Sequence, residues 1–271
     1  MLPLLDLRNG LNQRPLVRSR KQSTGQFAVT TCRDHPEFFD ASVELEDETW
    51  EDLSFLDYTP AHYAYYDTLL ERFPEYHLCM VDVETRELIA TGMCVPLRVA
   101  PGSTLPREGW DWLVNTAESQ DSKDANTIGA LSISVPKKHR DKGLARDMID
   151  TMRSLAAMKG FARVIAPVRP SAKCEHPFVP MEQYVDWVDD RGRIFDPWLR
   201  SHVAVGGDVV GVCDRSMVVE QPIDFWKPWV GSHLAQSGNV PVKGALVPVE
   251  VDVATGMGRY VEPNVWVSHN V

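Results

Sequence analysis

The sequence has few cysteines, and they form no recognisable framework. The five cysteines are scattered among 271 residues, and no Cys-x-x-Cys pair occurs. A disulfide-stapled secreted fold is therefore disfavoured, and reduced thiols are expected. Cys174-Glu175-His176 could suggest a ligand group, but a second ligand pair at finger-like spacing is missing. We predict no metal site.

Long apolar runs and leader features are also missing. No run reaches the roughly 18 apolar residues of a membrane-spanning helix. The N-terminal MLPLLDLRNG has no basic segment ahead of its apolar residues and no small-residue cleavage site. We therefore expect a cytoplasmic protein with no membrane partner, and the oligomeric state stays open.

An excess of positive charge is absent as well. The chain carries 28 Lys and Arg against 38 Asp and Glu, a net charge of −10. General nucleic-acid binding is disfavoured for so acidic a protein. The acidic runs at 44–48 and 186–190 are interpreted as solvated helix faces and loops, whereas 137–146 is locally basic. This pattern favours one anionic ligand at a local site.

The two common nucleotide loops do not occur. The sequence contains neither Gly-x-x-x-x-Gly-Lys-Ser/Thr nor Gly-x-Gly-x-x-Gly. Because these loops cradle phosphates in P-loop ATPases and Rossmann dehydrogenases, both classes are disfavoured.

The most informative pattern present is a strand, a basic turn and a helix. Ile128–Val135 is an apolar run that predicts a buried strand, and residues 144–159 predict an amphipathic helix that ends at Gly160. Arg163–Val168 predicts a second buried strand. Helix N-termini present unpaired N–H groups and partial positive charge. The turn before residue 144 is therefore a candidate phosphate site.

This arrangement resembles the GNAT N-acyltransferase superfamily. The acyl-CoA signature of that family is Gln/Arg-x-x-Gly-x-Gly/Ala, and Arg140-Asp141-Lys142-Gly143-Leu144-Ala145 matches it. The resemblance implies acetyl-CoA or another acyl-CoA as cosubstrate, with its pyrophosphate bound by backbone N–H groups. It also implies a bulged fourth strand that receives the rest of the cosubstrate. The implied cofactor-binding residues are Ile133, Val135, Lys138, His139, Arg140, Lys142, Gly143, Leu144, Ala145 and Arg146.

The resemblance implies an α/β fold with a mixed, mostly antiparallel central sheet, flanking helices and an elaborated β-rich C-terminal half. Before the phosphate turn, the patterns predict a strand at 26–31, helices at 34–56 and 59–73, a hairpin at 77–95 and a helix within 107–118. After residue 169 they predict helices at 181–188 and 224–234, and strands at 201–205, 208–213, 215–219, 244–253 and 258–267.

We expect one domain over residues 1–271. An acyl-CoA-binding core would occupy residues 26–169, and residues 170–271 would complete the sheet and the acceptor pocket. A separate β-rich module after about residue 205 is the alternative.

The catalytic groups are less clear than the phosphate turn. Many family members carry a glutamate base on the fourth strand, but no glutamate lies within 128–135. Ser134, or its neighbour Ser132, could relay a proton through water. Tyr184 matches the general acid of the family, and His202 is a further candidate base. Each of these side chains also has an ordinary structural interpretation.

The predicted function is transfer of an acyl group, acetyl in the first instance, from a CoA thioester to a small-molecule amine within a ternary complex. An aminoacyl-tRNA or a carrier-protein thioester is an alternative donor, since the N-terminal arm is basic. The third interpretation is an acyl-CoA-binding module without catalysis, motivated by the missing strand glutamate.

Overall fold

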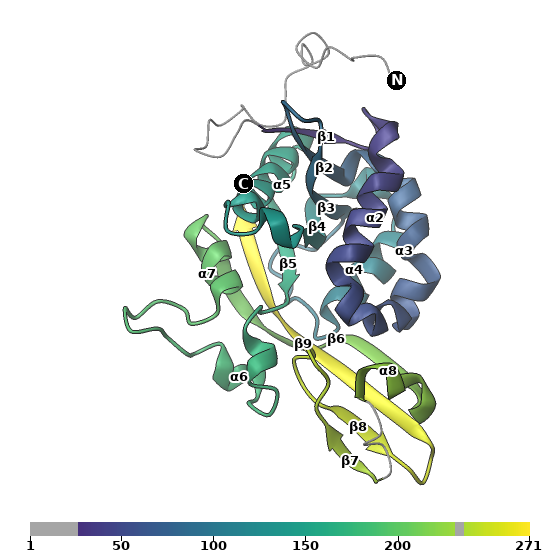
Figure 1. The fold of residues 1–271 in the computed structure, drawn as a ribbon. Helices are drawn as coiled ribbons and strands as arrows, with labels where there is room; N and C mark the ends of the chain where they lie inside the picture. The colour runs from purple at the N-terminus through teal and green to yellow at the C-terminus, as the bar shows by residue number, and fades with distance from the viewer. Residues whose placement is uncertain (1–26, 231–235) are drawn as a thin grey trace.

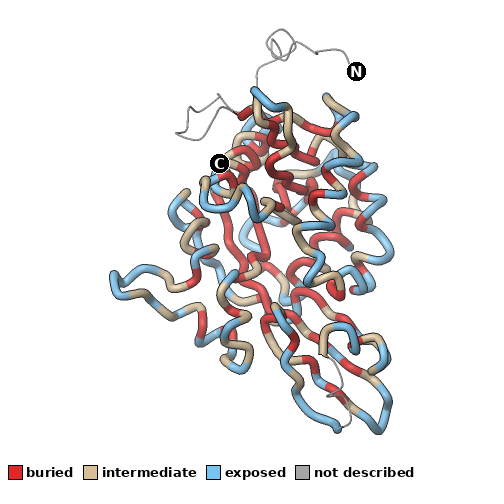
Figure 2. The backbone as a smooth tube through the Cα atoms, in the orientation of Figure 1, coloured by how far each residue is buried: buried red, intermediate tan, exposed pale blue. Residues whose placement is uncertain are grey.

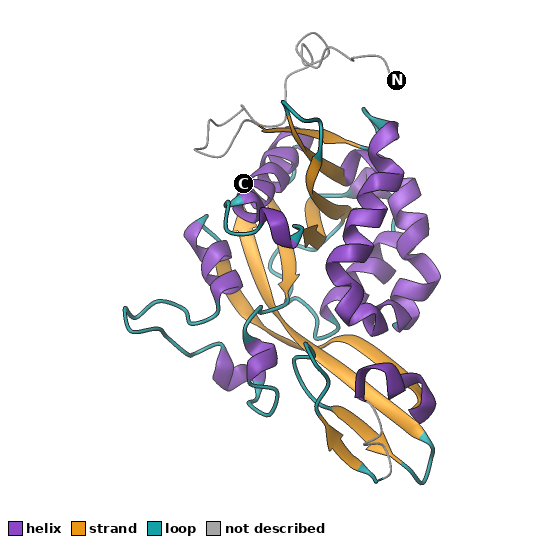
Figure 3. Cartoon of the chain, in the orientation of Figure 1, coloured by secondary structure: helices purple, strands orange, loops and turns teal. Residues whose placement is uncertain are grey.

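Nine strands of the computed structural model form one sheet in the order β1-β2-β3-β4-β5-β9-β8-β7, with β6 also paired to β9. The structure describes residues 27–230 and 236–271, so the basic N-terminal arm lies outside them. Among these residues, β4 and β5 pair in parallel and the other pairings are antiparallel. Figure 3 shows helices flanking this sheet, so the expected mixed α/β class is confirmed.

The elements follow the predicted order along the chain as far as β5. The strands are β1 Phe27–Thr31, β2 His77–Asp82, β3 Leu88–Leu97, β4 Thr127–Ser134, β5 Arg163–Val168, β6 Asp208–Pro222, β7 Gly238–Val240, β8 Val249–Asp252 and β9 Met257–Asn270. The α-helices are α2 Phe39–Trp50, α3 Pro60–Arg72, α4 Gly109–Ser119, α5 Leu144–Lys159, α6 Met181–Tyr184, α7 Pro197–Ala204 and α8 Lys227–Val230. No helix of the described residues is long and apolar enough to cross a membrane.

Short 3₁₀ turns join several of these elements. They are η1 Pro36–Phe38, η2 Glu51–Tyr58, η3 Pro74–Tyr76, η4 Ser122–Asp124, η5 Lys137–His139, η6 Lys173–Glu175 and η7 Ile223–Trp226. Of these, η2 links α2 to α3, and η5 forms part of the predicted phosphate turn.

Helices cover both faces of the sheet (Figure 1). On one face α5 packs so closely that a Cβ at Gly92 of β3 would lie 2.9 Å from Met148. On the opposite face α4 approaches Gly129 of β4, where a Cβ would lie 2.7 Å from Leu113. The helices α2 and α3 lie beside α4 on this second face, and Figure 2 shows the buried residues concentrated on the central strands between the layers.

The centre of the sheet is irregular at β4. Met93 of β3 pairs with Ser132 and Cys94 pairs with Ala130, so Leu131 is the extra residue of a β-bulge. The pairing of β4 with β5 covers only Thr127–Gly129 against Arg163–Ile165. Beyond these residues the two strands continue without pairing to each other. The bulge that the resemblance implied is therefore present, and the two strands open beside it.

The C-terminal part contributes to the same sheet. The long strands β6 and β9 form an antiparallel pair, and β9 lies along the full length of β5. Figure 1 shows this pair extending beyond the central sheet, with β7 and β8 beside its far end. Phe55 of η2 packs against the rings of Trp226, Trp229 and Tyr260 at 5.2–5.7 Å, which joins this extension to the N-terminal helices.

Three local predictions need correction. The strand predicted at 201–205 is part of helix α7, because Asp196 caps the N–H groups of Trp198 and Leu199 and Pro197 occupies the first helical position. The helix predicted at 181–188 stops at Tyr184. The strands predicted at 208–213 and 215–219 are one irregular strand, β6.

Candidate acyltransferase site

The predicted phosphate turn has the backbone geometry of an anion site. Asp141 and Gly143 have φ of 63° and 80°, in the left-handed region that glycine adopts without strain. Gly143 immediately precedes α5, and no side chain caps the first turn of that helix. The first N–H groups of α5 are therefore available to an external anion.

Basic side chains surround this turn, and two of them lie beside the carboxylate of Glu87. Lys138 forms an ion pair with Glu87, and His139 Nε2 lies 3.4 Å from the same carboxylate. Lys142 Nζ lies 3.1 Å from His139 Nδ1, and Arg140 Nε donates to Val135 O at 3.3 Å. Because Glu87 and Lys138 are both well exposed, their pairing is weak and can exchange for a phosphate.

The strand end of the predicted donor site lies beside the opening between β4 and β5. Ile133 pairs with Gly92 of β3, next to the bulge at Leu131, and Val135 follows the last residue of β4. The predicted donor residues are thus contiguous, from the half of β4 that does not pair with β5, through the turn, to the first turn of α5.

The three catalytic candidates from the sequence do not converge on one point. Ser134 is buried and accepts a hydrogen bond from Trp50 Nε1 at 2.9 Å. Tyr184 is buried and donates to Asp196 at 3.0 Å. His202 lies on α7, not on a strand, and its Nδ1 is 2.9 Å from His269 Nε2. Each of these side chains has a structural partner, and their catalytic roles stay predictions.

Burial disfavours the charged forms of two of these groups. Burial, with Asp196 beside the phenol, raises the pKa of Tyr184. Burial lowers the pKa of His202 to about 3, and His269 acts in the same direction. A histidine that stays neutral in this way fits a packed joint between α7 and β9.

A polar pair that the sequence did not single out faces the β4 bulge. Glu46 of α2 accepts hydrogen bonds from Tyr66 of α3, whose hydroxyl is 3.0 Å from both carboxylate oxygens. Burial raises the pKa of Glu46, and Ser132 lies near enough to oppose that shift. Ser132 Oγ is nevertheless buried with no hydrogen-bond partner among the described residues. Glu46 therefore brings a carboxylate to the strand that lacks one.

Aromatic side chains tie this pair to the bulge. Trp110 of α4 donates its indole N–H to Leu131 O at 3.0 Å. The His62 ring is stacked against both Trp110 and Tyr66, with ring centroids 5.5 Å and 4.5 Å away. Burial lowers the pKa of His62 to about 4, so this imidazole is neutral near pH 7. The bulge, Trp110, His62 and Tyr66 form one packed unit.

Further carboxylates lie around Glu46. Burial and the nearby charges of Asp47, Glu46 and Asp67 raise the pKa of Asp57 to about 6. Burial and the charge of Asp67 also raise the pKa of Asp47. We call Glu46, Asp47, Asp57 and Asp67 the acidic face. Their mutual repulsion indicates a place where a cation would be stabilised.

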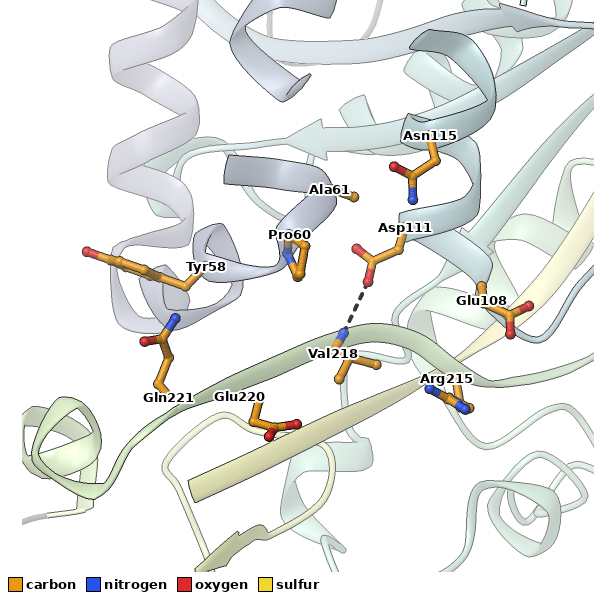
Figure 4. A pocket seen from close by; sticks show the side chains of 10 residues that line it. All are labelled: Tyr58, Pro60, Ala61, Glu108, Asp111, Asn115, Arg215, Val218, Glu220 and Gln221. Atoms are coloured by element: carbon orange, nitrogen blue, oxygen red, sulfur yellow. Dashed lines mark hydrogen bonds between the residues drawn. The ribbon is translucent and has the colours of Figure 1, made fainter. Parts of the chain in front are cut away.

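A cavity of about 400 Å³ lies between α3, α4 and β6 (Figure 4). Glu108, Asp111 and Glu220 line it together with Arg215. Asp111 accepts a hydrogen bond from Val218 N at 3.2 Å, drawn in Figure 4, and burial raises the pKa of Asp111 to about 7. The cavity extends the carboxylate-rich character of the α3 and α4 side of the molecule.

A second buried polar cluster lies where β5 ends beside β9. Arg169 Nε is 3.0 Å from both carboxylate oxygens of Glu262, and its Nη2 donates to Gly244 O. Tyr260 and Asn264 donate to the same carboxylate. Glu262 and Asn264 are therefore engaged with neighbours in the interior. No group of residues suited to a metal ion occurs within 27–230 and 236–271.

The comparisons with known proteins agree with this geometry. No family model matches the chain. A curated relative, arginine N-acetyltransferase avaD from Aspergillus versicolor, is 33% identical over 276 residues, covering 90% of this chain and 94% of the relative. The loading GNATL domain of CurA from Lyngbya majuscula matches with a TM-score of 0.59 and 13% identity, over 90% of this chain and 97% of that domain.

A GNAT-like decarboxylase, GphF in complex with isobutyryl-CoA, matches with a TM-score of 0.52 and 16% identity, over 89% of this chain and 98% of that one. At such identities the two solved structures establish the fold alone. The bulged β4, its opening from β5 and the turn before α5 define a GNAT-type acyltransferase. With the curated relative, they place the chain in the GNAT superfamily, and it is an N-acyltransferase.

Proposed function

We propose that this N-acyltransferase moves an acetyl group from acetyl-CoA to the amine of a small cationic metabolite of the arginine class. The acidic face beside the β4 bulge carries the proposal. Burial and repulsion by Asp67 raise the pKa of Asp47, and burial with repulsion by Asp47, Glu46 and Asp67 raises the pKa of Asp57. A guanidinium or ammonium group bound there would relieve that repulsion.

The donor proposal is supported by the opposite charge at the other end of the opening. The turn of residues 137–146 joins unpaired N–H groups at the start of α5 to lysine and arginine side chains. A CoA pyrophosphate would bind there, with the pantetheine arm along Ile133 and Val135. The name of the curated relative supports acetyl as the acyl group and arginine as the acceptor class.

An acceptor panel tests the cationic requirement. Purified protein would be incubated with acetyl-CoA and L-arginine, L-lysine, agmatine or L-citrulline, with CoA thiol release and product mass as readouts. Citrulline is the matched control, because its urea group has nearly the shape of guanidinium and no charge. We expect turnover with the cationic amines and at least a tenfold lower kcat/KM with citrulline. Equal rates for arginine and citrulline would contradict recognition by the acidic face.

A donor panel tests the acyl-CoA requirement. Acetyl-CoA, longer acyl-CoA thioesters and aminoacyl-tRNA would be compared with the preferred acceptor. We expect the highest kcat/KM with acetyl-CoA. Turnover with charged tRNA alone, weakened steeply by salt, would replace this proposal with the tRNA-dependent alternative.

A further inference from the structure

The site leaves one chemical role that β4 itself does not fill. Residues 128–135 contain no carboxylate or imidazole, yet an amine must lose a proton before it can attack a thioester. We propose that Glu46, supplied by helix α2 instead of strand β4, takes this proton. This inference rests on the proposed function and assigns the catalytic base within the same site.

The position of Glu46 follows from tertiary contacts. Its carboxylate is fixed by Tyr66, whose hydroxyl lies 3.0 Å from both oxygens. The Tyr66 ring lies 5.6 Å from the Trp110 ring, and Trp110 holds the carbonyl of the bulged residue Leu131. The carboxylate is therefore fixed relative to the point where β4 opens from β5, which is where a thioester along β4 would end.

Ser132 supplies an independent sign that a ligand belongs here. Its hydroxyl is buried without a hydrogen-bond partner among the described residues, although it lies close to Glu46. An unsatisfied buried hydroxyl costs free energy unless a water or substrate group completes it. A water or amine held between Ser132 and Glu46 would satisfy both groups and place a transferable proton at the carboxylate.

The surroundings set the basicity of Glu46. Burial raises its pKa, while the nearby Ser132 hydroxyl, the hydrogen bond from Tyr66 and the charge of His77 on β2 lower it, and Asp47 raises it. The charged groups facing it from α3 and η2 are Asp67 and Asp57, and His62 between them is neutral. A carboxylate with a raised pKa is a better base near neutral pH than an ordinary glutamate.

Glu46 takes one proton from the acceptor ammonium group and frees the nitrogen lone pair, which attacks the thioester carbonyl carbon. The C–N bond forms, the C–S bond breaks, and the electron pair leaves on sulfur. A second proton of the nitrogen neutralises the thiolate, giving the amide and CoA thiol. The proton on Glu46 then passes to solvent.

Glu46→Gln tests the assignment, with Glu48→Gln as its matched control. Glu48 is an exposed acid on the same helix, so its variant removes an equal charge away from the bulge. We expect Glu46→Gln to lower kcat about 100-fold or more at pH 7. The KM for acetyl-CoA and the melting temperature should stay near those of the unaltered protein, and Glu48→Gln should keep full activity. An active Glu46→Gln variant would overturn the proposal.

The pH profile separates a base from a merely structural carboxylate. In the unaltered protein, kcat/KM should fall on the acid side as Glu46 becomes protonated. That limb should disappear in Glu46→Gln, and the rate of the variant should recover as pH rises through the acceptor amine pKa, since free amine then needs no base. A low, pH-independent rate in Glu46→Gln would show that Glu46 only supports the structure.

Tyr66→Phe keeps the proposal testable if Glu46→Gln does not fold. Loss of the Tyr66 hydrogen bond removes an influence that lowers the pKa of Glu46, so the acid limb should move to higher pH. An unmoved limb would overturn the assignment. If the unaltered protein turns over only a neutral amine, the proposed acceptor class fails, and the Glu46 experiment continues with that amine.

Discussion

We propose the basic turn of residues 137–146 as the donor side of the site and the Glu46–Tyr66 pair as its acceptor side, and the chain builds the two differently. The turn is a single run of sequence, exposed over much of its length, and its geometry follows from Gly143 and the start of α5. The pair joins residues 20 positions apart and meets a strand more than 60 residues later. A local sequence motif therefore predicts the proposed donor side, whereas the proposed acceptor side forms only through tertiary packing.

The largest expected effect tests how strongly interior polar groups depend on distant partners. Arg169→Ala would leave the fully buried Glu262 without its guanidinium. We expect the free energy of unfolding to fall by about 3–5 kcal/mol, because an uncompensated buried charge remains. Urea denaturation measures this change.

Arg33→Ala is the control for Arg169→Ala. Arg33 and Glu75 form an ion pair 2.7 Å long, but the arginine side chain is 59% exposed. Its loss should cost less than about 1 kcal/mol. Equal losses for the two variants would mean that burial does not distinguish interior from surface pairs in this protein.

Gly143→Val should disrupt the basic turn of residues 137–146, which is the proposed donor side. At φ 80° a β-branched side chain is strained, and a changed turn would misdirect the first N–H groups of α5. We expect the KM for acetyl-CoA to rise about 10-fold to 100-fold, measured with saturating acceptor.

Gly160→Ala provides the matched control at the other end of α5. Gly160 has φ 73°, so the backbone strain is similar, and no atom lies within 4 Å of a Cβ there. This variant should lose about 1 kcal/mol of stability and keep its KM for acetyl-CoA. A raised KM in Gly160→Ala would show that the turn responds to helix stability instead of anion contact.

The difference between local motifs and long-range packing also explains which parts of the structure could be predicted from the sequence. Helix 144–159 and strand 163–168 have the predicted bounds, because apolar periodicity and the flanking glycines all lie within the segment. A local signal of the same kind starts α3, where the Thr59 side chain caps the helix by accepting a hydrogen bond from His62 N. Patterns of this kind extend over one turn or one strand and need no knowledge of distant residues.

Residues after 169 were predicted less well for a physical reason. Ser201–Val205 is rich in residues that suit a strand, but the Asp196 cap and Pro197 start a helix just before it.

Glu46 lies within the acidic run 44–48, which the sequence analysis interprets as a solvated face. One signal was present, since Ser42, Glu46 and Trp50 recur every four residues along α2, and Ser42 is buried.

A smaller effect tests the joint between α7 and β9, which is also built from distant residues. Burial lowers the pKa of His202 to about 3, below its ordinary value of 6.5, so the folded protein resists protonation there. The contribution of His202 to stability is therefore present above pH 6.5 and is lost as pH falls towards 3. Between pH 6.5 and 5.5 this loss is about 1 kcal/mol.

His202→Asn isolates that contribution. Other groups also titrate in this range, so the comparison is the change in unfolding free energy of each protein between the two pH values. The unaltered protein should lose about 1 kcal/mol more than the variant. Equal slopes would mean that His202 titrates in the folded protein as it does in the unfolded chain.

The smallest expected effect concerns a single exposed charge on the donor side. Lys138→Ala should raise the KM for acetyl-CoA only a few-fold, because the N–H groups of α5 and the other basic side chains remain. Lys138 pairs with Glu87, so a variant of Glu87 provides a second measurement of the same contact. Glu87 lies against the turn and opposes an anion there, so Glu87→Gln should lower the KM.

The double variant Lys138→Ala with Glu87→Gln distinguishes a direct contact between Lys138 and phosphate from an effect of Lys138 on the electrostatic potential at the turn. If Lys138 binds phosphate directly, Lys138→Ala should raise the KM by a similar factor whether residue 87 is Glu or Gln. If Lys138 only neutralises Glu87, its removal should have no effect once Glu87→Gln is present. Salt gives an independent reading, since screening reduces both effects when the groups are exposed. A Glu87→Gln variant with a raised KM would show that Glu87 organises the turn, and the donor side would then depend on a tertiary contact as the acceptor side does.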